Sequence, residues 1–63
     1  MKNQYWIKER HNPQLGVYYV ACGQITKKDA REHENSSLYG YNVMHPFPTE
    51  EAYEARLNEL RES

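Results

Sequence analysis

The sequence is poor in cysteine, glycine and proline, and it contains no long apolar run. Cys22 is the only cysteine among 63 residues, so no internal disulfide forms and a cysteine-based structural zinc site lacks its ligands. The three glycines are isolated from one another, which excludes a glycine-rich phosphate loop and a nucleotide-dependent enzyme built on it. No segment approaches the roughly 18 apolar residues of a membrane span, and the first residues lack a signal-peptide pattern. We therefore expect a soluble, cytoplasmic protein.

Aromatic residues, by contrast, are plentiful at 13%, with 38% of residues hydrophobic and 27% charged. This composition predicts a folded chain, and residues 1–63 are expected to form a single small domain. The net charge of -1 hides a polarity, because residues 1–31 carry six cations and two anions, whereas residues 32–63 carry two cations and seven anions. Such a division permits head-to-tail self-association or binding to a charged partner.

Two strands and a hairpin are predicted in the first third of the chain. Residues 4–10 alternate in polarity and are rich in aromatic and branched side chains, which favours a strand. Residues 11–16 include Pro13 and Gly16 and predict the hairpin loop. Residues 17–22 form an unbroken run of apolar residues and tyrosines, which predicts an antiparallel second strand that is buried on both sides.

A helix, an edge strand and a second helix are predicted after the hairpin. Thr26 precedes Asp29 by three residues, which is close to a capping box and predicts a helix that begins directly after Thr26. Residues 41–47 alternate as a strand does, and Pro46 places that strand at an edge because proline has no N–H to donate. The last helix, over residues 50–61, carries an apolar stripe at helical spacing, formed by Tyr53, Leu57 and Leu60.

Together these elements predict an α+β fold of order β-β-α-β-α. A right-handed crossover through the first helix places the third strand next to the first, which gives a three-stranded antiparallel sheet of order 2-1-3. Both helices are expected on one face, as in a two-layer α+β domain. The opposite face then exposes more apolar surface than a monomer tolerates, which predicts a homodimer or an obligate complex with a protein partner. The alternative is a compact monomer with one helix on each face.

Metal-binding and catalytic groups are sparse. The soft metal ligands are His11, Cys22, His33 and His45. Their spacings of 11, 11 and 12 residues provide no close pair, so neither a metal nor another cofactor is expected. Cys22 with His33 or His45 offers a nucleophile and a base, but no third orienting group or oxyanion hole is recognisable. We therefore expect a protein without enzymatic activity.

Aromatic and acidic side chains predict a protein-binding surface. Tyrosine and tryptophan dominate interface hot spots, and surface charge raises the rate of association. The predicted partner-binding residues are Trp6, Tyr18, Tyr39 and Tyr41, with Glu50, Glu51 and Glu54 as a charged rim. The alternative is binding of single-stranded nucleic acid, in which aromatic rings stack on bases and cations hold phosphates. Its predicted residues are Tyr5, Trp6, Lys8, Arg10, Lys27 and Lys28.

The opening residues also carry a resemblance. The chain begins Met1-Lys2, continues Tyr5-Trp6-Ile7-Lys8-Glu9 in a predicted strand, and has a capped helix at Thr26 with no catalytic constellation. In these features it resembles the small phage-encoded inhibitors of host defence, including anti-CRISPR proteins. The resemblance implies a compact protein, often dimeric, that acts in the host cytoplasm by occupying the surface of a larger nucleic-acid-handling complex. The sequence thus predicts a non-enzymatic protein-protein interaction module, such as a small inhibitor or adaptor.

Overall fold

The chain folds in the predicted order β-β-α-β-α, and the computed structural model describes residues 4–36 and 39–62. Its elements are β1 (Gln4–Asn12), β2 (Gly16–Ile25), α1 (Lys27–Asn35), β3 (Tyr41–Phe47) and α2 (Glu50–Glu62). The predicted start of the first helix is confirmed, because Thr26 Oγ1 accepts a hydrogen bond from the Asp29 N–H at 3.1 Å and caps α1. Met1 and Lys2 lie outside the described residues.

The three strands form one antiparallel sheet with β1 in the centre, which confirms the predicted order 2-1-3. The predicted end of the second strand at residue 22 is wrong, because β2 continues to Ile25. The register between β1 and β2 shifts between Trp6 and Ile7, and this bulge leaves Cys22 without a directly opposed residue on β1. Gly23 has a φ of 75°, which glycine adopts without a steric penalty, so it carries the strand through the bulge instead of ending it.

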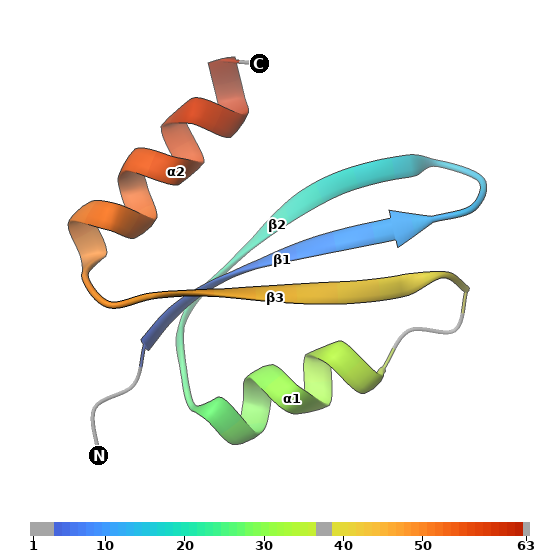
Figure 1. The fold of residues 1–63 in the computed structure, drawn as a ribbon, viewed down its shortest axis with the longest axis horizontal. Coiled ribbons are helices and arrows are strands. Elements are labelled where there is room, and N and C mark those ends of the chain that lie inside the picture. Colours follow the sequence, from blue (N-terminus) through green and yellow to red (C-terminus); the bar gives the residue numbers. More distant parts are fainter. Residues whose placement is uncertain (1–3, 37–38, 63) are drawn as a thin grey trace.

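The two helices lie on opposite sides of the sheet (Figure 1). Tyr5 and Trp6 are consecutive in β1, so their side chains point to opposite faces. Trp6 lines a small cavity with Ala30 of α1, whereas the Tyr5 ring packs against Tyr53 of α2 with ring centroids 5.3 Å apart. The prediction of a two-layer domain with both helices on one face is therefore wrong. The crossover rule fixes where β3 lies, but the face that the following helix covers depends on packing, here an edge-to-face contact of Phe47 with Tyr53.

The hydrophobic core is small. Its buried residues within the described chain are Trp6, Ile7, Ala30 and Tyr53. The molecule is a thin slab, with principal-axis extents of 34 × 30 × 10 Å. Figure 1 shows the reason: α1 runs alongside β3, α2 leans away from β2, and the hairpin end of the sheet projects beyond both helices.

The prediction that the second strand is buried on both sides is wrong. Val17, Tyr18 and Tyr19 of β2 are all exposed. An unbroken apolar run is typical of a strand covered on both faces, but β2 is an edge strand whose first half lies beyond both helices in Figure 1. Its apolar side chains therefore form part of the surface instead of the core.

Candidate interaction surface

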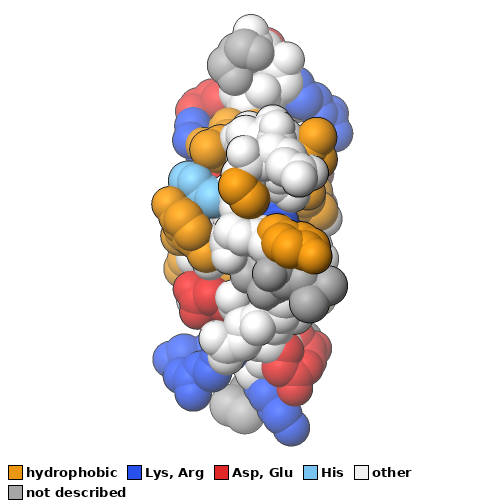
Figure 2. All heavy atoms as spheres, turned by 90° about the vertical axis from the view of Figure 1, so that its right-hand side faces the viewer, with side chains coloured by type: hydrophobic (Ala, Val, Ile, Leu, Met, Phe, Trp, Pro, Cys, Tyr) orange, Lys and Arg blue, Asp and Glu red, His pale blue; other side chains and the backbone are white. Residues whose placement is uncertain are grey.

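Exposed apolar side chains gather at the hairpin end of the sheet. Leu15 in the hairpin turn is 76% exposed, and Tyr39 and Tyr41, before and at the start of β3, are 72% and 56% exposed. The Tyr41 ring stacks on the His11 ring with centroids 4.2 Å apart. Figure 2 views this end and shows hydrophobic side chains across its middle, with charged side chains mainly above and below them. We call Leu15, Tyr39 and Tyr41 the hairpin-end patch.

Polar contacts hold the backbone of the hairpin-end patch. The Arg10 guanidinium of β1 donates hydrogen bonds to the Tyr39 carbonyl oxygen and to Asn42 Oδ1, the second at 3.2 Å. Buried Asn42 in turn donates from Nδ2 to the His33 carbonyl oxygen of α1 at 2.6 Å. This chain of hydrogen bonds joins β1, β3 and α1, so the segment that carries Tyr39 is fixed by three elements.

A second apolar surface lies between β2 and α2. It is a groove of about 510 Å³, lined mainly by Val17, Tyr19, Ala21, Leu57 and Leu60. The three β2 residues alternate along the strand and therefore share the face that α2 approaches. The two leucines belong to the predicted apolar stripe of α2, of which Tyr53 is buried and the leucines are half-buried. We call this surface the β2–α2 groove.

Glu9 is the centre of a polar cluster on the same face of the sheet. Its carboxylate accepts hydrogen bonds from Nε2 of His11 and from Nε2 of His45, the second at 3.2 Å. The hydrogen bond from His11 is the main cause that places the pKa of Glu9 below its ordinary value, and partial burial opposes it. Glu9 therefore stays ionised to a lower pH than a free glutamate does.

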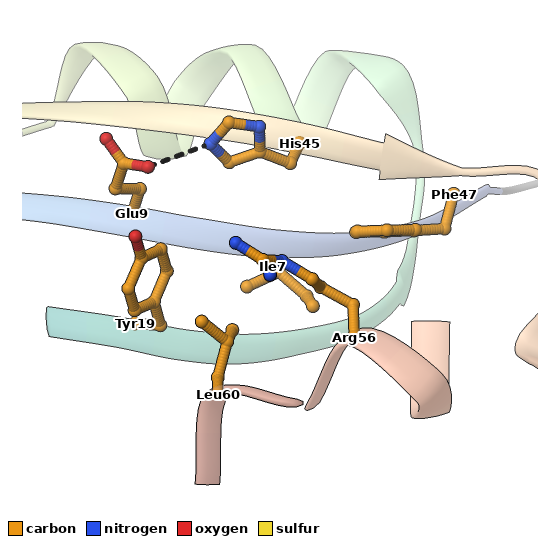
Figure 3. Close-up of a pocket in the computed structure, with 7 residues that line it drawn as sticks. All are labelled: Ile7, Glu9, Tyr19, His45, Phe47, Arg56 and Leu60. Carbon is orange, nitrogen blue, oxygen red and sulfur yellow. Dashed lines mark hydrogen bonds and ion pairs between the residues drawn. The ribbon is translucent and has the colours of Figure 1, made fainter. Parts of the chain in front are cut away.

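A small pocket opens beside Glu9 under α2 (Figure 3). Figure 3 shows the Tyr19 hydroxyl pointing towards Glu9 and the Arg56 side chain extending from α2 across Ile7. The pocket volume is about 110 Å³, which is less than the roughly 300 Å³ of the smallest usual ligand sites. A pocket of this size has room for a few water molecules but not for an organic substrate. Across residues 4–36 and 39–62, no cluster of three or more His, Cys, Asp or Glu side chains has the arrangement of a metal site.

Cys22 lies in the bulge of β2, whereas the two histidines predicted as its possible base, His33 and His45, lie on α1 and β3. Its Sγ–H contacts the Val20 carbonyl oxygen at 3.8 Å, and burial raises the pKa of the thiol. A raised pKa lowers the thiolate fraction near neutral pH and makes the sulfur a weaker nucleophile. His45 is engaged by Glu9 and lies on β3, with β1 between it and the strand of Cys22, and His33 lies in the last turn of α1.

Of the four aromatic residues predicted to contact a partner, three are exposed and one is buried. Tyr18, Tyr39 and Tyr41 are exposed in or near the hairpin end, as a contact surface requires. Trp6 is buried on the side of the sheet that α1 covers, so its place in a partner-binding surface is corrected. The error has a physical reason, because a strand residue faces either the covering helix or solvent, and alternation alone does not say which.

The predicted acidic rim lies at the other end of the sheet. Glu50, Glu51 and Glu54 are exposed on the first turns of α2. The seven residues of β3 separate them from Tyr41 by about 20 Å. Glu50 Oε2 accepts a hydrogen bond from the Tyr5 hydroxyl at 3.3 Å. The three carboxylates therefore do not border the hairpin-end patch.

The aromatic rings of the nucleic-acid alternative are occupied within the fold. Trp6 is buried, and the Tyr5 ring packs against Tyr53. The Arg10 guanidinium is engaged by Asn42 and by the backbone of residue 39. The other predicted cations are half-buried Lys8 and exposed Lys27 and Lys28. The protein's own side chains thus cover the rings on which bases would stack.

The cluster of Glu9, His11 and His45 was not predicted from the sequence. One signal was present, because Glu9 and His11 are two residues apart in a strand and therefore share a face. Nothing local indicates that His45 joins them, since its position follows from the register that sets His45 opposite Ile7. Leu15 was also not predicted, because a turn residue belongs to no periodic pattern, although it is the most exposed large hydrophobic residue of the described chain.

Within the described residues, neither helix has the length and apolar content needed to cross a membrane. No protein-family model, curated protein or solved structure matches the chain.

Proposed function

We propose that this chain is a non-enzymatic protein-binding module that acts as a small inhibitor or adaptor on the surface of a larger complex. The observation that carries the proposal is the exposure of Leu15, Tyr39 and Tyr41 at the hairpin end of the sheet, where the segment around Gly40 passes beside the hairpin. Clustered apolar groups on a soluble surface are typical of interaction sites. Tyrosine suits this task because its ring fills an apolar pocket while its hydroxyl bonds at the wet rim.

The fixed geometry of the patch supports specific recognition. Arg10 holds Tyr39 through the backbone carbonyl oxygen, which leaves the tyrosine ring at the surface. The His11 ring orients Tyr41 by stacking. Ordering a mobile side chain on binding costs about 0.5–1.5 kcal/mol. A patch that is already ordered avoids part of this cost, which favours a folded protein with a complementary apolar pocket as the partner.

The resemblance to phage-encoded inhibitors of host defence gives the sharpest version of the proposal. In this version the partner is a nucleic-acid-handling defence complex, and the chain blocks it by occupying its surface. Glu50, Glu51 and Glu54 then face a basic region of that complex and raise the rate of association. A phage-plating assay tests this version: the expressed chain restores plaque formation on a CRISPR-immune host. Unchanged immunity in hosts of each CRISPR type contradicts it.

Affinity capture with matched variants tests the protein-binding function itself. The double variant Leu15→Ser, Tyr39→Ala removes two exposed side chains but keeps the bond from Arg10 to the backbone of residue 39. From a nuclease-treated lysate of the source cell or its host, we expect the wild-type chain to capture a protein partner. The double variant is expected to capture at least about tenfold less, as loss of a hot spot implies.

The control for this capture is Lys28→Ala, an exposed change on α1. It lies outside the hairpin-end patch and is expected to retain the partner. Capture that nuclease treatment abolishes, or that Lys28→Ala weakens as much as the double variant does, contradicts the proposal. Either result favours the nucleic-acid alternative.

A further inference from the structure

The free edge of β2 lacks the protection that edge strands normally carry. Residues Gly16–Ile25 include no charged residue and no proline. Lysine, proline or a covering element normally keeps other strands from pairing with the N–H and C=O groups of an edge. The other edge strand has such protection, because β3 contains Pro46 and α1 runs alongside it (Figure 1). β2 is therefore the open edge of the sheet.

The surface of the molecule is large for its mass. The accessible area is 4899 Å², whereas a compact monomer of 7.5 kDa exposes about 4,250 Å². The excess of about 650 Å² approaches the roughly 800 Å² that each partner buries in a standard protein interface. The radius of gyration is 11.9 Å, and about 10.6 Å is expected for 63 residues. The surplus surface thus matches what one stable contact with another molecule would cover.

We infer that a second copy of the chain covers this surplus by pairing antiparallel along β2. A copy presents an equally uncharged edge, so no like charges meet when the strand pairs with itself. Tyr18, Tyr19 and Val20 then become cross-strand neighbours, and aromatic and β-branched residues form the favoured pairs in antiparallel sheets. A highly charged partner finds no complementary charge along β2. The product is a six-stranded sheet with two-fold symmetry.

The symmetry determines how the two copies meet. Antiparallel pairing of identical strands requires a two-fold axis perpendicular to the sheet, which keeps the corresponding faces on the same side. The bulge at Cys22 limits regular pairing to the first part of β2 and centres the axis near Tyr19. Tyr19 then lies opposite its own symmetry copy, and Val17 lies opposite Ala21. These three residues line the β2–α2 groove, so the two grooves join into one apolar surface between the two α2 helices.

This interface is separate from most of the hairpin-end patch. Tyr39 and Tyr41 belong to the β3 side of the sheet, whereas the pairing uses the β2 edge. A dimer therefore still presents its tyrosines to a protein partner. Dimer formation does not rest on the proposed function, and each can fail in experiments while the other stands.

Sedimentation equilibrium of the whole chain tests the dimer. We expect the wild type to have twice the mass of 7.5 kDa at the concentrations used for NMR. Tyr19→Lys places a charge on the open edge and is expected to give the monomer mass, and Glu9 opposite residue 19 accommodates the new ammonium group. Tyr39→Lys, the matched change near β3, is expected to stay dimeric. A wild type of 7.5 kDa at every concentration overturns the inference, as does a Tyr39→Lys monomer beside a Tyr19→Lys dimer.

Disulfide crosslinking tests the strand assignment even if Tyr19→Lys does not fold. In a Cys22→Ser background, one cysteine is placed at Val17, Tyr19 or Ala21, with Tyr39→Cys as the control. Directly opposed residues of an antiparallel pair have Cβ atoms about 4.5–5.5 Å apart, which is near the distance in a disulfide. We expect Tyr19→Cys to form the covalent dimer fastest. The inference is overturned if none of the three β2 variants crosslinks faster than Tyr39→Cys.

Discussion

Tyr53 is the residue that joins α2 to all three strands. Its buried ring contacts Tyr5 of β1 and Phe47 of β3, and its hydroxyl accepts a hydrogen bond from the Gly23 N–H of β2 at 3.1 Å. Gly23 lies at the bulge, where the regular ladder between β1 and β2 is interrupted. The hydroxyl therefore satisfies a partly buried donor that the sheet does not satisfy.

Tyr53→Phe distinguishes the contribution of the hydroxyl to stability from that of the ring. The variant keeps the aromatic contacts and removes the acceptor for the Gly23 N–H, so we expect the free energy of unfolding to fall by about 1–2 kcal/mol. Urea denaturation at a fixed protein concentration measures this loss. Tyr39→Phe removes a hydroxyl from an exposed ring and is the control, with a change below about 0.5 kcal/mol. Equal losses in the two variants would argue against the role of the hydroxyl.

Glu9 makes stability depend on pH at the acid end. The hydrogen bonds from His11 and His45 hold its pKa below the ordinary value of 4.5, so the folded state takes up the proton less readily than the unfolded state. This contribution is complete above pH 4.5 and is lost as the pH falls through the lower folded-state pKa. We expect Glu9→Gln to flatten the acid limb of a plot of unfolding free energy against pH. Glu32→Gln, an exposed change on α1, is expected to leave that limb steep.

The pH experiment uses urea denaturation at a series of pH values for the three proteins. The comparison isolates Glu9, because Glu9→Gln keeps the shape of the side chain and removes its titration. Acid limbs of the same slope for wild type and Glu9→Gln would show that the cluster does not stabilise the fold.

At the scale of elements, one glycine sets the approach of β3 to the hairpin. Gly40 precedes β3 with a φ of 82°. A Cβ at this position would overlap the His11 carbonyl oxygen of β1. The missing side chain lets the segment pass directly beside the hairpin, and this approach brings Tyr39 and Tyr41 to the same end of the molecule as Leu15.

Gly40→Ala tests this approach, with Gly16→Ala as the matched control. Both glycines have positive φ, 82° and 90°, but a Cβ at Gly16 meets no atom within 4 Å among the described residues. We expect Gly16→Ala to lower the free energy of unfolding by about 1–2 kcal/mol through backbone strain alone. Gly40→Ala adds steric overlap and is expected to cost about 3 kcal/mol or more. Chemical denaturation of both variants measures the difference, and equal costs would contradict the close approach.

At the scale of the whole molecule, the thin shape limits how much apolar surface a single chain can bury. The slab extends only 10 Å along its shortest axis, and the sheet beyond the helices is covered on neither face (Figure 1). A domain of about 60 residues buries only about 60% of its unfolded surface even when it is compact. The association along β2 that we infer would supply the burial that the single chain lacks.

The melting temperature is therefore expected to depend on protein concentration. If folding is coupled to dimer formation, each tenfold increase in concentration raises the midpoint by about 5 °C. Differential scanning calorimetry over a concentration series measures this rise. Tyr19→Lys is expected to melt at a lower temperature that does not change with concentration. A constant midpoint for the wild type would show that the folded state does not depend on a second copy.

Local patterns in the sequence determined the elements and their order. Three patterns were sufficient: the alternation in β1 and β3, the Thr26 cap and the apolar stripe of α2. Each depends only on residues that are close together in the sequence, so each can be recognised without coordinates. The crossover rule then gave the strand order 2-1-3, because handedness leaves few alternatives for a short connection.

Only the tertiary structure decided which face each helix covers and which apolar residues stay exposed. Trp6 and Tyr18 are both aromatic residues of predicted strands, but Trp6 is buried and Tyr18 is exposed, because α1 packs on β3 and β1 and does not cover the first half of β2 (Figure 1). Glu9 meets His45 only through the register of β1 with β3. The placement of the helices, the exposure of apolar side chains and the contact of Glu9 with His45 all depend on packing between residues that are far apart in the chain. A local sequence pattern contains no information about this packing.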